Sequence, residues 1–321
     1  MAKDLKYYES QLRRIEEHRE KTAEKEIRKM YKEMLKDLQH FIADEYIKLA
    51  EDGKLTYEIL HGKNRYASFL AEVEGHLNGI SPKVSREIRN TVEEIYKIGY
   101  EGMVDAVRKS TTSEELYTAL RSVSSVTPET IQAVVNNPVS GLTLSDTLEK
   151  NRRDIIYDIK RQIGIGLTQG DRMSTMARRI AESIDNDYKK AVRIARTEVH
   201  RVREEGHLNA CVGIDETLQK GVSGMRLVKT WMTMKDNRVR PNRMYKVKGG
   251  WRQGKSGGED HVRMEGATVL ANEEFLLSGG AKALAPGKSG VAGHDINCRC
   301  TIEYSLMSDA EYYEKTGKHF S

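Results

Sequence analysis

Two cysteines and one histidine close to the C-terminal end form the segment of this chain that is best suited to chemistry. Cys298 and Cys300 are separated by one residue, and His294 stands four residues before Cys298. Thiolates and imidazoles are common zinc ligands, and these three groups with a fourth from elsewhere would complete a closed tetrahedral site. The spacing argues against such a site, because zinc folds usually place two to four residues between paired cysteines.

Packing and redox roles stay open for the same cysteines. In an extended strand, a C-x-C sequence places both sulfurs on one face, with the Cα atoms roughly 6–7 Å apart. Cys298 and Cys300 would then face a small core as compact apolar side chains, with Asn297 at the turn into the strand. Cys211 would pack beside them. A disulfide or another redox role is the remaining alternative. We expect no bound metal and no cofactor here.

A small α+β domain is expected to position this segment. Residues 227–234 and 300–306 have strand composition. Between them lie two glycine-rich loops, at 249–260 and 278–293, where helix periodicity is lost. The loops lack the strand–loop–helix context that phosphate binding requires.

The rest of the chain reads as long helices. Residues 1–52 contain no Gly or Pro, and their nearly polar stretch at 16–26 indicates a charged arm that projects into solvent or packs on a partner. Breaks are expected at 51–54 and at 78–82, where Ser81 can cap and Pro82 can open a new helix. Further helices are expected to begin at Thr127–Pro128 and to cover 142–165, 173–184 and 187–212.

The helix predicted over 187–212 carries a basic row. Its members recur at intervals of three and four residues and so share one face: Arg193, Arg196, His200, Arg203 and His207. Such a row would lie along phosphates, pair with carboxylates of a partner, be a solvated face, or be neutralised by Glu204, Glu205 and other acids of the chain. Gly206 would allow a neighbouring segment to approach closely.

The charged segment that follows the first predicted strand suits a turn. Asp236 precedes Asn237, and Pro241 follows closely. Arg238 and Arg240 alternate and would project to the same side of an extended segment. The strand itself contains Trp231.

Three segments, taken in order, resemble the Mu F-like head morphogenesis family of tailed-phage minor head proteins. They are Ala195-Arg196-Thr197-Glu198, the stretch from Lys229 to Pro241 that holds Trp231, Asp236, Arg238 and Arg240, and Asn297-Cys298-Arg299-Cys300. The resemblance covers roughly residues 150–306. Where the family usually has a His after the proline, this chain has Arg243, which counts against a metal site there. We expect Arg196 or Glu198 to hold the small C-terminal domain through a buried, charge-assisted hydrogen bond.

The resemblance implies a non-enzymatic minor head (capsid) protein of a tailed phage or prophage. Such a protein would bind the portal protein and other head proteins and aid head assembly, DNA packaging or ejection. It would lie in the capsid interior near the portal, after assembly in the host cytoplasm. The alternatives are a protein that binds double-stranded DNA of the packaged genome, or a zinc- or cysteine-dependent enzyme using His294 and Cys298.

Composition and motifs exclude few of these roles. The 53 basic and 48 acidic residues leave a net charge of +5, which permits contact with nucleic acid but does not require it. No run of 18 apolar residues predicts a membrane span, and three cysteines do not make a disulfide framework, as expected in a reducing cytoplasm. Neither H-E-x-x-H nor P-C-x-x-C occurs. A thiol enzyme would need Asp236, His294 and Cys298 to converge. We expect no catalytic residue.

The predicted architecture is mainly α, an elongated helical body with a small C-terminal α+β domain. Its expected segments are a charged helical arm at 1–52, a helical body at 53–185, a module at 186–308 made of a long helix and a small α+β cap, and a tail at 309–321.

Overall fold

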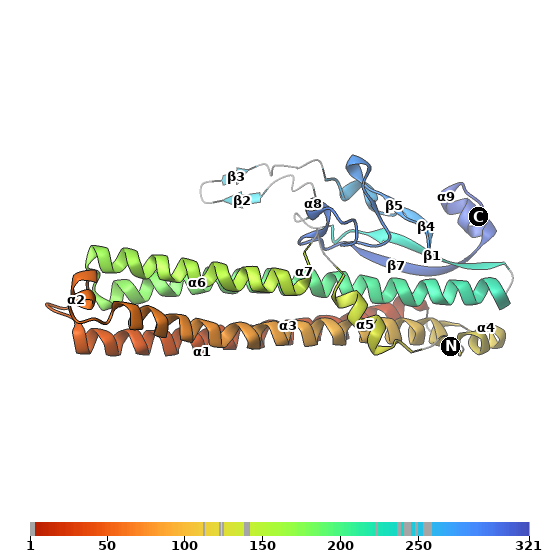
Figure 1. Cartoon of the computed structure of the whole chain (residues 1–321). Coiled ribbons are helices and arrows are strands. Elements are labelled where there is room, and N and C mark those ends of the chain that lie inside the picture. Colours follow the sequence, from red (N-terminus) through yellow and green to blue (C-terminus); the bar gives the residue numbers. More distant parts are fainter. Residues whose placement is uncertain are drawn as a thin grey trace. The chain divides into compact units, whose positions relative to one another are not determined.

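A computed structural model gives the fold, and it describes residues 4–111, 113–121, 123, 125–137, 142–221, 224–235, 239–240, 245–247, 250–252 and 259–320. The mainly α prediction with a small C-terminal α+β part is confirmed (Figure 1). The helices are α1 (Leu5–Leu49), α2 (Tyr57–Gly62), α3 (Tyr66–Ser110), α4 (Glu114–Leu120), α5 (Pro128–Val135), α6 (Leu144–Gln169), α7 (Met173–Gly221), η1 (Val262–Met264), η2 (Ser278–Gly280), α8 (Ala292–Asp295) and α9 (Asp309–Thr316). The strands are β1 (Met225–Met232), β2 (Tyr245–Val247), β3 (Gly250–Arg252), β4 (Thr268–Leu270), β5 (Phe275–Leu276), β6 (Lys282–Ala283) and β7 (Thr301–Ser308).

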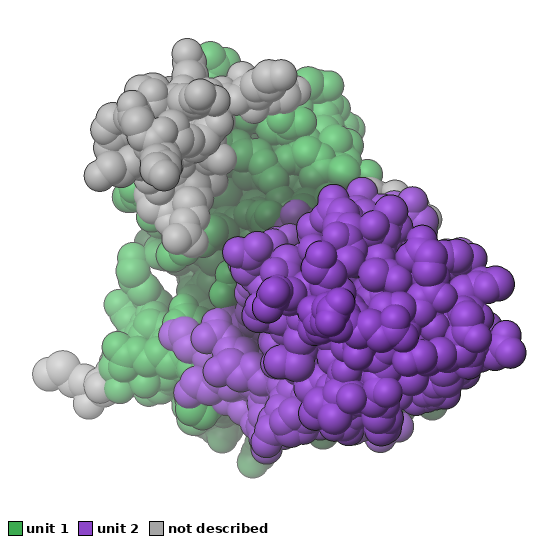
Figure 2. Space-filling view, turned by 90° about the vertical axis from the view of Figure 1, so that its left-hand side faces the viewer, with its two compact units in different colours: residues 1–20, 91–143, 196–321 green, residues 21–90, 144–195 purple. Residues whose placement is uncertain are grey.

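The chain forms two compact units, which Figure 2 colours separately. Unit 1 consists of Met1–Glu20, Thr91–Thr143 and Arg196–Ser321, and unit 2 consists of Lys21–Asn90 and Leu144–Ala195. Helices α1, α3 and α7 each contribute residues to both units. Neither unit is contiguous in sequence, so the four contiguous segments expected above stay a proposal as domains.

Unit 2 is built from segments of α1, α3, α6 and α7 around an aliphatic core. Its fully buried side chains include Ile27, Leu38, Ile42, Phe69, Val73, Leu77, Ile159, Ile163, Met176 and Ile180. Within a helix these residues mostly recur every four positions, the kind of pattern that predicted helices here. The Tyr31 hydroxyl donates to Asp187 Oδ2 at 2.6 Å, and burial raises the pKa of Asp187 to about 6.

Two of the predicted helix boundaries are wrong. Helix α3 continues through Pro82, because Leu77, Ile80 and Val84 keep one buried stripe across that point while Pro82 itself is exposed. Packing of the stripe outweighs the lost backbone hydrogen bond. The helices expected over 173–184 and 187–212 are one helix, α7.

Other boundaries are confirmed. Helix α5 begins at Pro128, and its Thr127 cap accepts a hydrogen bond from Thr130 N. The break after α1 is a tight turn in which Asp52 and Gly53 have φ of 52° and 73°. A glycine is favoured at such a positive φ because it carries no Cβ.

The expected solvated arm is a packed helix. Along α1, Leu5 and Leu12 in unit 1 are buried, as are Ala23 and Ile27 in unit 2. Acidic side chains of the same helix are buried as well, Glu16 among them. The polar segment 16–26 is therefore not solvated on every side: Glu16 and Ala23 are buried, while most of its other residues are exposed.

The small sheet of unit 1 has the strand order β4-β1-β7, and both pairs are antiparallel. Its two longer strands were predicted from the sequence. Trp231 of β1 stands opposite Ile302 of β7. One face packs on the C-terminal half of α7, where Cys211 and Ile214 join the same core as Trp231 and Ile302 (Figure 1).

The free edge of β7 is covered by side chains from helices. Tyr304 N donates to Glu9 Oε1 of α1 at 3.1 Å, and Ile302 N donates to Glu204 Oε2 of α7 at 3.2 Å. The Arg13 guanidinium donates to the Ile302 carbonyl. An open strand edge is a site of unwanted pairing, and these contacts satisfy it within the chain. Among the described residues, no helix combines the length and the apolar character needed to cross a bilayer.

Candidate functional site

The cysteine segment lies at the start of β7 and is buried. Cys298 and Cys300 are 6% and 2% exposed. Asn297 has a φ of 56°, so it makes the left-handed turn into the strand, as predicted. Cys300 and Trp231 belong to one hydrophobic core. This confirms the prediction that the cysteines face a small core, although they have a polar neighbour there.

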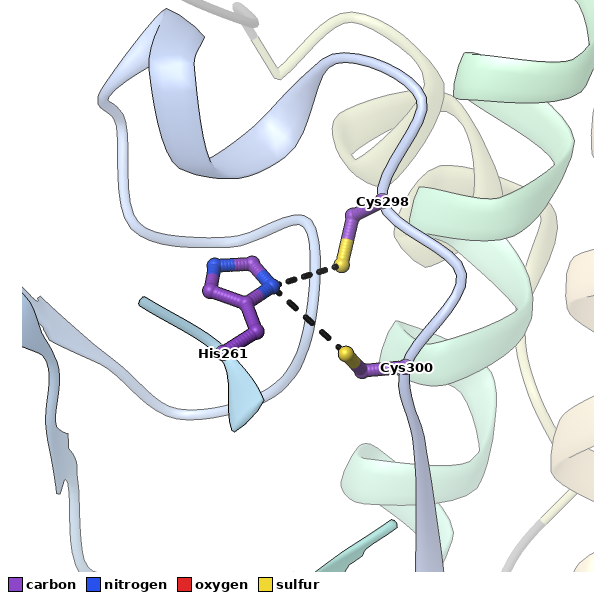
Figure 3. A group of neighbouring side chains, drawn as sticks. All are labelled: His261, Cys298 and Cys300. Atoms are coloured by element: carbon purple, nitrogen blue, oxygen red, sulfur yellow. Dashed lines mark hydrogen bonds between the residues drawn. The ribbon is translucent and has the colours of Figure 1, made fainter. Parts of the chain in front are cut away.

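That neighbour is His261, which the sequence reasoning missed. Its Nδ1 lies 3.6 Å from Cys298 Sγ and 3.5 Å from Cys300 Sγ (Figure 3). The three ligand atoms lie within 4.8 Å of one another, and all three residues are buried. His261 stands 37 residues before Cys298, in a segment with no periodicity or motif, so the sequence carries no signal for it.

His294, the predicted zinc candidate, lies behind His261 and not beside the sulfurs. The two rings are stacked at 5.2 Å, with His261 Nε2 2.9 Å from His294 Nδ1. His294 Nε2 lies 3.2 Å from the Ser278 carbonyl, which can only accept. His294 therefore carries its proton on Nε2 and accepts at Nδ1. His261 in turn donates from Nε2, and its Nδ1 presents a lone pair to both cysteines.

His200 of α7 approaches the cluster from the other side. It is 6% exposed and lies near Cys298, and burial lowers the pKa of His200. Arg203 Nη2 lies 2.9 Å from His200 Nδ1, and because a guanidinium only donates, that nitrogen accepts. The neutral ring then carries its proton on Nε2, which is the nitrogen available to Cys298.

The two thiols differ in acidity. A hydrogen bond from Cys298 to Cys300 lowers the pKa of Cys300 and raises that of Cys298. The buried Trp231 indole, which completes no hydrogen bond of its own, also favours the Cys300 thiolate. Two adjacent sulfurs of unequal acidity are suited to metal binding, to oxidation, or to packing without reaction.

Arg240 fixes the two loops that carry this cluster. Its guanidinium donates to the carbonyls of His294, at 2.6 Å, and Ile296. Its own carbonyl accepts from the backbone N–H groups of His261, at 2.8 Å, and Val262, at 3.0 Å. The predicted motif residue is thus a positioning residue. Asp236 and Arg238, predicted with it, lie outside the described residues.

Of the two residues expected to anchor the C-terminal part to α7, Glu198 bonds within its own helix, and the role of Arg196 stays a prediction. Glu198 bonds to Arg201 on its own helix, at 2.9 Å, and burial raises the pKa of Glu198. Arg196 is exposed. The links to the C-terminal part come from Glu204, which accepts from Ile302 N, and from Glu205, which pairs with Lys288. In the sequence, the only sign of these links is that Glu204 and Glu205 stand next to each other on a helix predicted to pack against neighbours.

The basic row does not form a continuous exposed face. His207 is 2% exposed and lies 2.7 Å from Glu16 of α1. Arg203 is largely buried, with Glu20 and Glu204 at 3.7 and 3.6 Å. His200 is buried at the cysteine cluster, while Arg193 and Arg196 are exposed. Neutralisation by acids of the chain, one of the readings left open above, describes the buried part of the row.

A further motif can be read in the glycine-rich segment. The residues Gly249, Gly254, Lys255 and Ser256 have the spacing of a phosphate-binding P-loop. That loop joins a strand to a helix, whereas β3 (Gly250–Arg252) falls inside this pattern and pairs with β2. The spacing is therefore a chance match.

The fold and this site define a helical protein with a small sheet closed by a C-x-C strand, held together by buried charge pairs. The family model described as Phage Mu protein F like protein matches residues 157–247. The chain is 26% identical over 285 residues to minor head protein GP7 of Bacillus phage SPP1, covering 88% of this chain and 82% of that protein. Both matches support a Mu F-like phage minor head protein.

A second relative carries a different name. The chain is 29% identical over 237 residues to NAD(+)--arginine ADP-ribosyltransferase EFV of Enterococcus faecalis (strain ATCC 700802 / V583). The match covers 74% of this chain but only 42% of that protein. No solved structure matches the chain. The family match includes Arg196, Glu198 and Trp231 and ends before His261 and the cysteines.

Proposed function

We propose that this chain is a structural, non-enzymatic minor component of a tailed-phage or prophage head that binds the portal protein and other head proteins. The observation that carries the proposal is the match to a minor head protein over 88% of this chain. The aligned region therefore includes residues of both compact units, because the unaligned remainder of the chain is smaller than either unit. The protein would reside in the virion, inside the capsid near the portal, after assembly in the host cytoplasm.

An ADP-ribosyltransferase activity is not part of this proposal. The relative with that name is matched over less than half of its own length. Two proteins that share one structural module, but differ elsewhere, give a partial match of this kind. Support for packaging and ejection is indirect, since a head protein bound at the portal stands where the genome passes.

Exposed apolar side chains on the helices offer places for a protein partner. Ile47, near the end of α1 in unit 2, is 82% exposed, the highest value for a large apolar side chain among the described residues. Tyr157 on α6 of the same unit is 68% exposed. Burying an isoleucine side chain against a partner contributes about 1.5–3 kcal/mol. We place a portal contact at Ile47.

Co-expression with the portal protein of the same phage tests the proposal. The wild-type chain should co-purify and co-elute with the portal at physiological salt. Ile47→Lys should weaken the complex, by roughly tenfold or more in affinity for the loss of about 1.5–3 kcal/mol. Tyr157→Lys is the matched control at another exposed apolar position. Absence of any complex with the wild-type chain would refute portal binding, whereas equal loss in both variants would refute the Ile47 contact alone.

A further inference from the structure

We propose that His261, Cys298 and Cys300 bind one zinc ion, through the imidazole Nδ1 and the two Sγ atoms. The inference concerns the stability and shape of unit 1 and does not depend on portal binding. It rests on the spacing of the three ligand atoms, on the orientation of the imidazole and on the absence of net charge in the resulting cluster.

The imidazole nitrogen stands at the spacing from both sulfurs that a tetrahedral zinc ion requires. Zn–S bonds of about 2.3 Å and Zn–N bonds of about 2.0–2.1 Å at tetrahedral angles place sulfur and nitrogen about 3.5–3.6 Å apart. The two distances from His261 Nδ1 to the sulfurs are 3.6 and 3.5 Å (Figure 3). The C-x-C spacing counted against zinc in the sequence, but in the fold both sulfurs lie at zinc-ligand spacing from one imidazole nitrogen.

The hydrogen bonds behind His261 prepare its Nδ1 as a ligand. A metal-bound imidazole usually donates its other N–H to a partner, which fixes the tautomer and the ring orientation. Here His261 Nε2 donates to His294 Nδ1, and His294 Nε2 donates to the Ser278 carbonyl. The single lone pair of Nδ1 faces both sulfurs at nearly equal distance, as in a ligand set arranged around one shared cation.

Charge and softness favour zinc in this buried position. Two thiolates balance a divalent cation, so a zinc cluster with a neutral His261 adds no net charge to the core. Sulfur and imidazole ligands suit zinc and exclude magnesium or calcium. The indole N–H of Trp231, near Cys300 and without another hydrogen bond, would further stabilise a bound thiolate.

Three protein ligands define the site, and we assign the fourth position to solvent. Among the described residues, no fourth ligand atom lies within 4.8 Å of all three. His200 is near Cys298, but Arg203 donates to its Nδ1, so its Nε2 carries a proton and cannot ligate. It would donate to the Cys298 sulfur instead.

Metal content of the full chain is the direct test. Protein purified under reducing conditions without chelator should contain about one zinc per chain, the occupancy that a resident site implies. Cobalt substitution should give thiolate charge-transfer absorption and visible ligand-field bands. Cys298→Ser, Cys300→Ser and His261→Asn should each lose the metal, while Cys211→Ala, which removes a buried cysteine from the same core, should keep it.

Two further variants separate ligands from positioning residues. His294→Gln should weaken zinc binding roughly 10–100-fold, as loss of a group that orients a ligand does. His200→Gln should have a smaller effect. If His200→Gln abolishes binding as completely as His261→Asn does, the three-ligand assignment is wrong.

If the variants fail to fold, zinc binding is measured on the folded wild-type chain by competition with a chromophoric chelator. A wild-type chain that stays metal-free after loading with zinc would overturn the proposal. So would cysteine variants that fold, as judged by helical circular dichroism, and hold zinc as the wild type does.

Discussion

Replacement of Glu9 by Gln should raise the stability of unit 1 above neutral pH. Glu9 lies on α1, is 5% exposed, and accepts a hydrogen bond from Tyr304 N at the free edge of β7. Burial, the largest cause, raises the pKa of Glu9 to about 7, although Arg13 nearby favours the ionised form. A glutamine keeps the acceptor and carries no charge to desolvate.

The magnitude follows from the raised pKa. Moving a carboxyl pKa from 4.5 to about 7 corresponds to about 3 kcal/mol against the ionised form in the folded state. Between these pH values the folded chain holds a proton that the unfolded chain has lost, so the free energy of unfolding falls as pH rises from about 4.5 to 7. This contribution is fully present below pH 4.5 and is lost above pH 7.

Urea unfolding at pH 5, 7 and 9 would measure the effect. Trp231 is buried in β1, so its fluorescence reports on unit 1 once Trp251, the other tryptophan of the sequence, is replaced by Phe. Glu9→Gln should match the parent at pH 5 and exceed it by up to about 3 kcal/mol at pH 9.

Glu26→Gln, at an exposed glutamate of the same helix, is the matched control and should change little at any pH. The comparison isolates Glu9, because His207 and Glu303, which also act on its pKa, are present in every variant. A Glu9→Gln curve parallel to that of the parent across the whole pH range would refute the argument.

Two further predictions concern α7 and β1. A Cβ at Gly206 would lie 2.8 Å from the Tyr96 carbonyl oxygen, so Gly206→Ala should lower the free energy of unfolding in urea by about 1–3 kcal/mol. Gly213, on the same helix, has open space around it, so Gly213→Ala should raise that free energy by up to about 1 kcal/mol. Equal effects of the two substitutions would contradict the close approach. Burial lowers the pKa of Lys229 to about 7, so the free energy of unfolding should rise with pH between about 7 and 10.5. Lys229→Met should remove that rise, even though it also leaves the Ala271 carbonyl without its donor. If the rise is unchanged in the variant, another group causes it.

Local signals in the sequence predicted local structure well. The strand composition of β1 and β7, the Thr127 cap and the turn at Asn297 all follow from residue preferences over a few positions. The close approach at Gly206 was also predicted, because a glycine on a buried helix stripe leaves room for a neighbour.

The residues that complete the site and the sheet edge could not be predicted in the same way. His261 meets the cysteines across 37 residues, and Glu9 meets Tyr304 across 295. Neither pairing leaves a periodic trace, since each partner is one polar residue whose role depends on tertiary contacts. Pro82 shows the reverse case, in which a strong local breaker is overridden by packing on both sides of it.

Buried charge pairs explain how a chain with only 38% apolar residues fixes its C-terminal sheet. Asp215 at the end of α7 accepts from the Arg226 guanidinium at 2.9 Å and from Leu227 N at 2.7 Å, which sets the direction in which β1 leaves the helix. Glu204 and Glu9 then hold the far edge of the same sheet. Each buried charge requires one particular donor, because leaving it unpaired is costly. Apolar area alone would allow the sheet to slide along α7, and these directional contacts select one register.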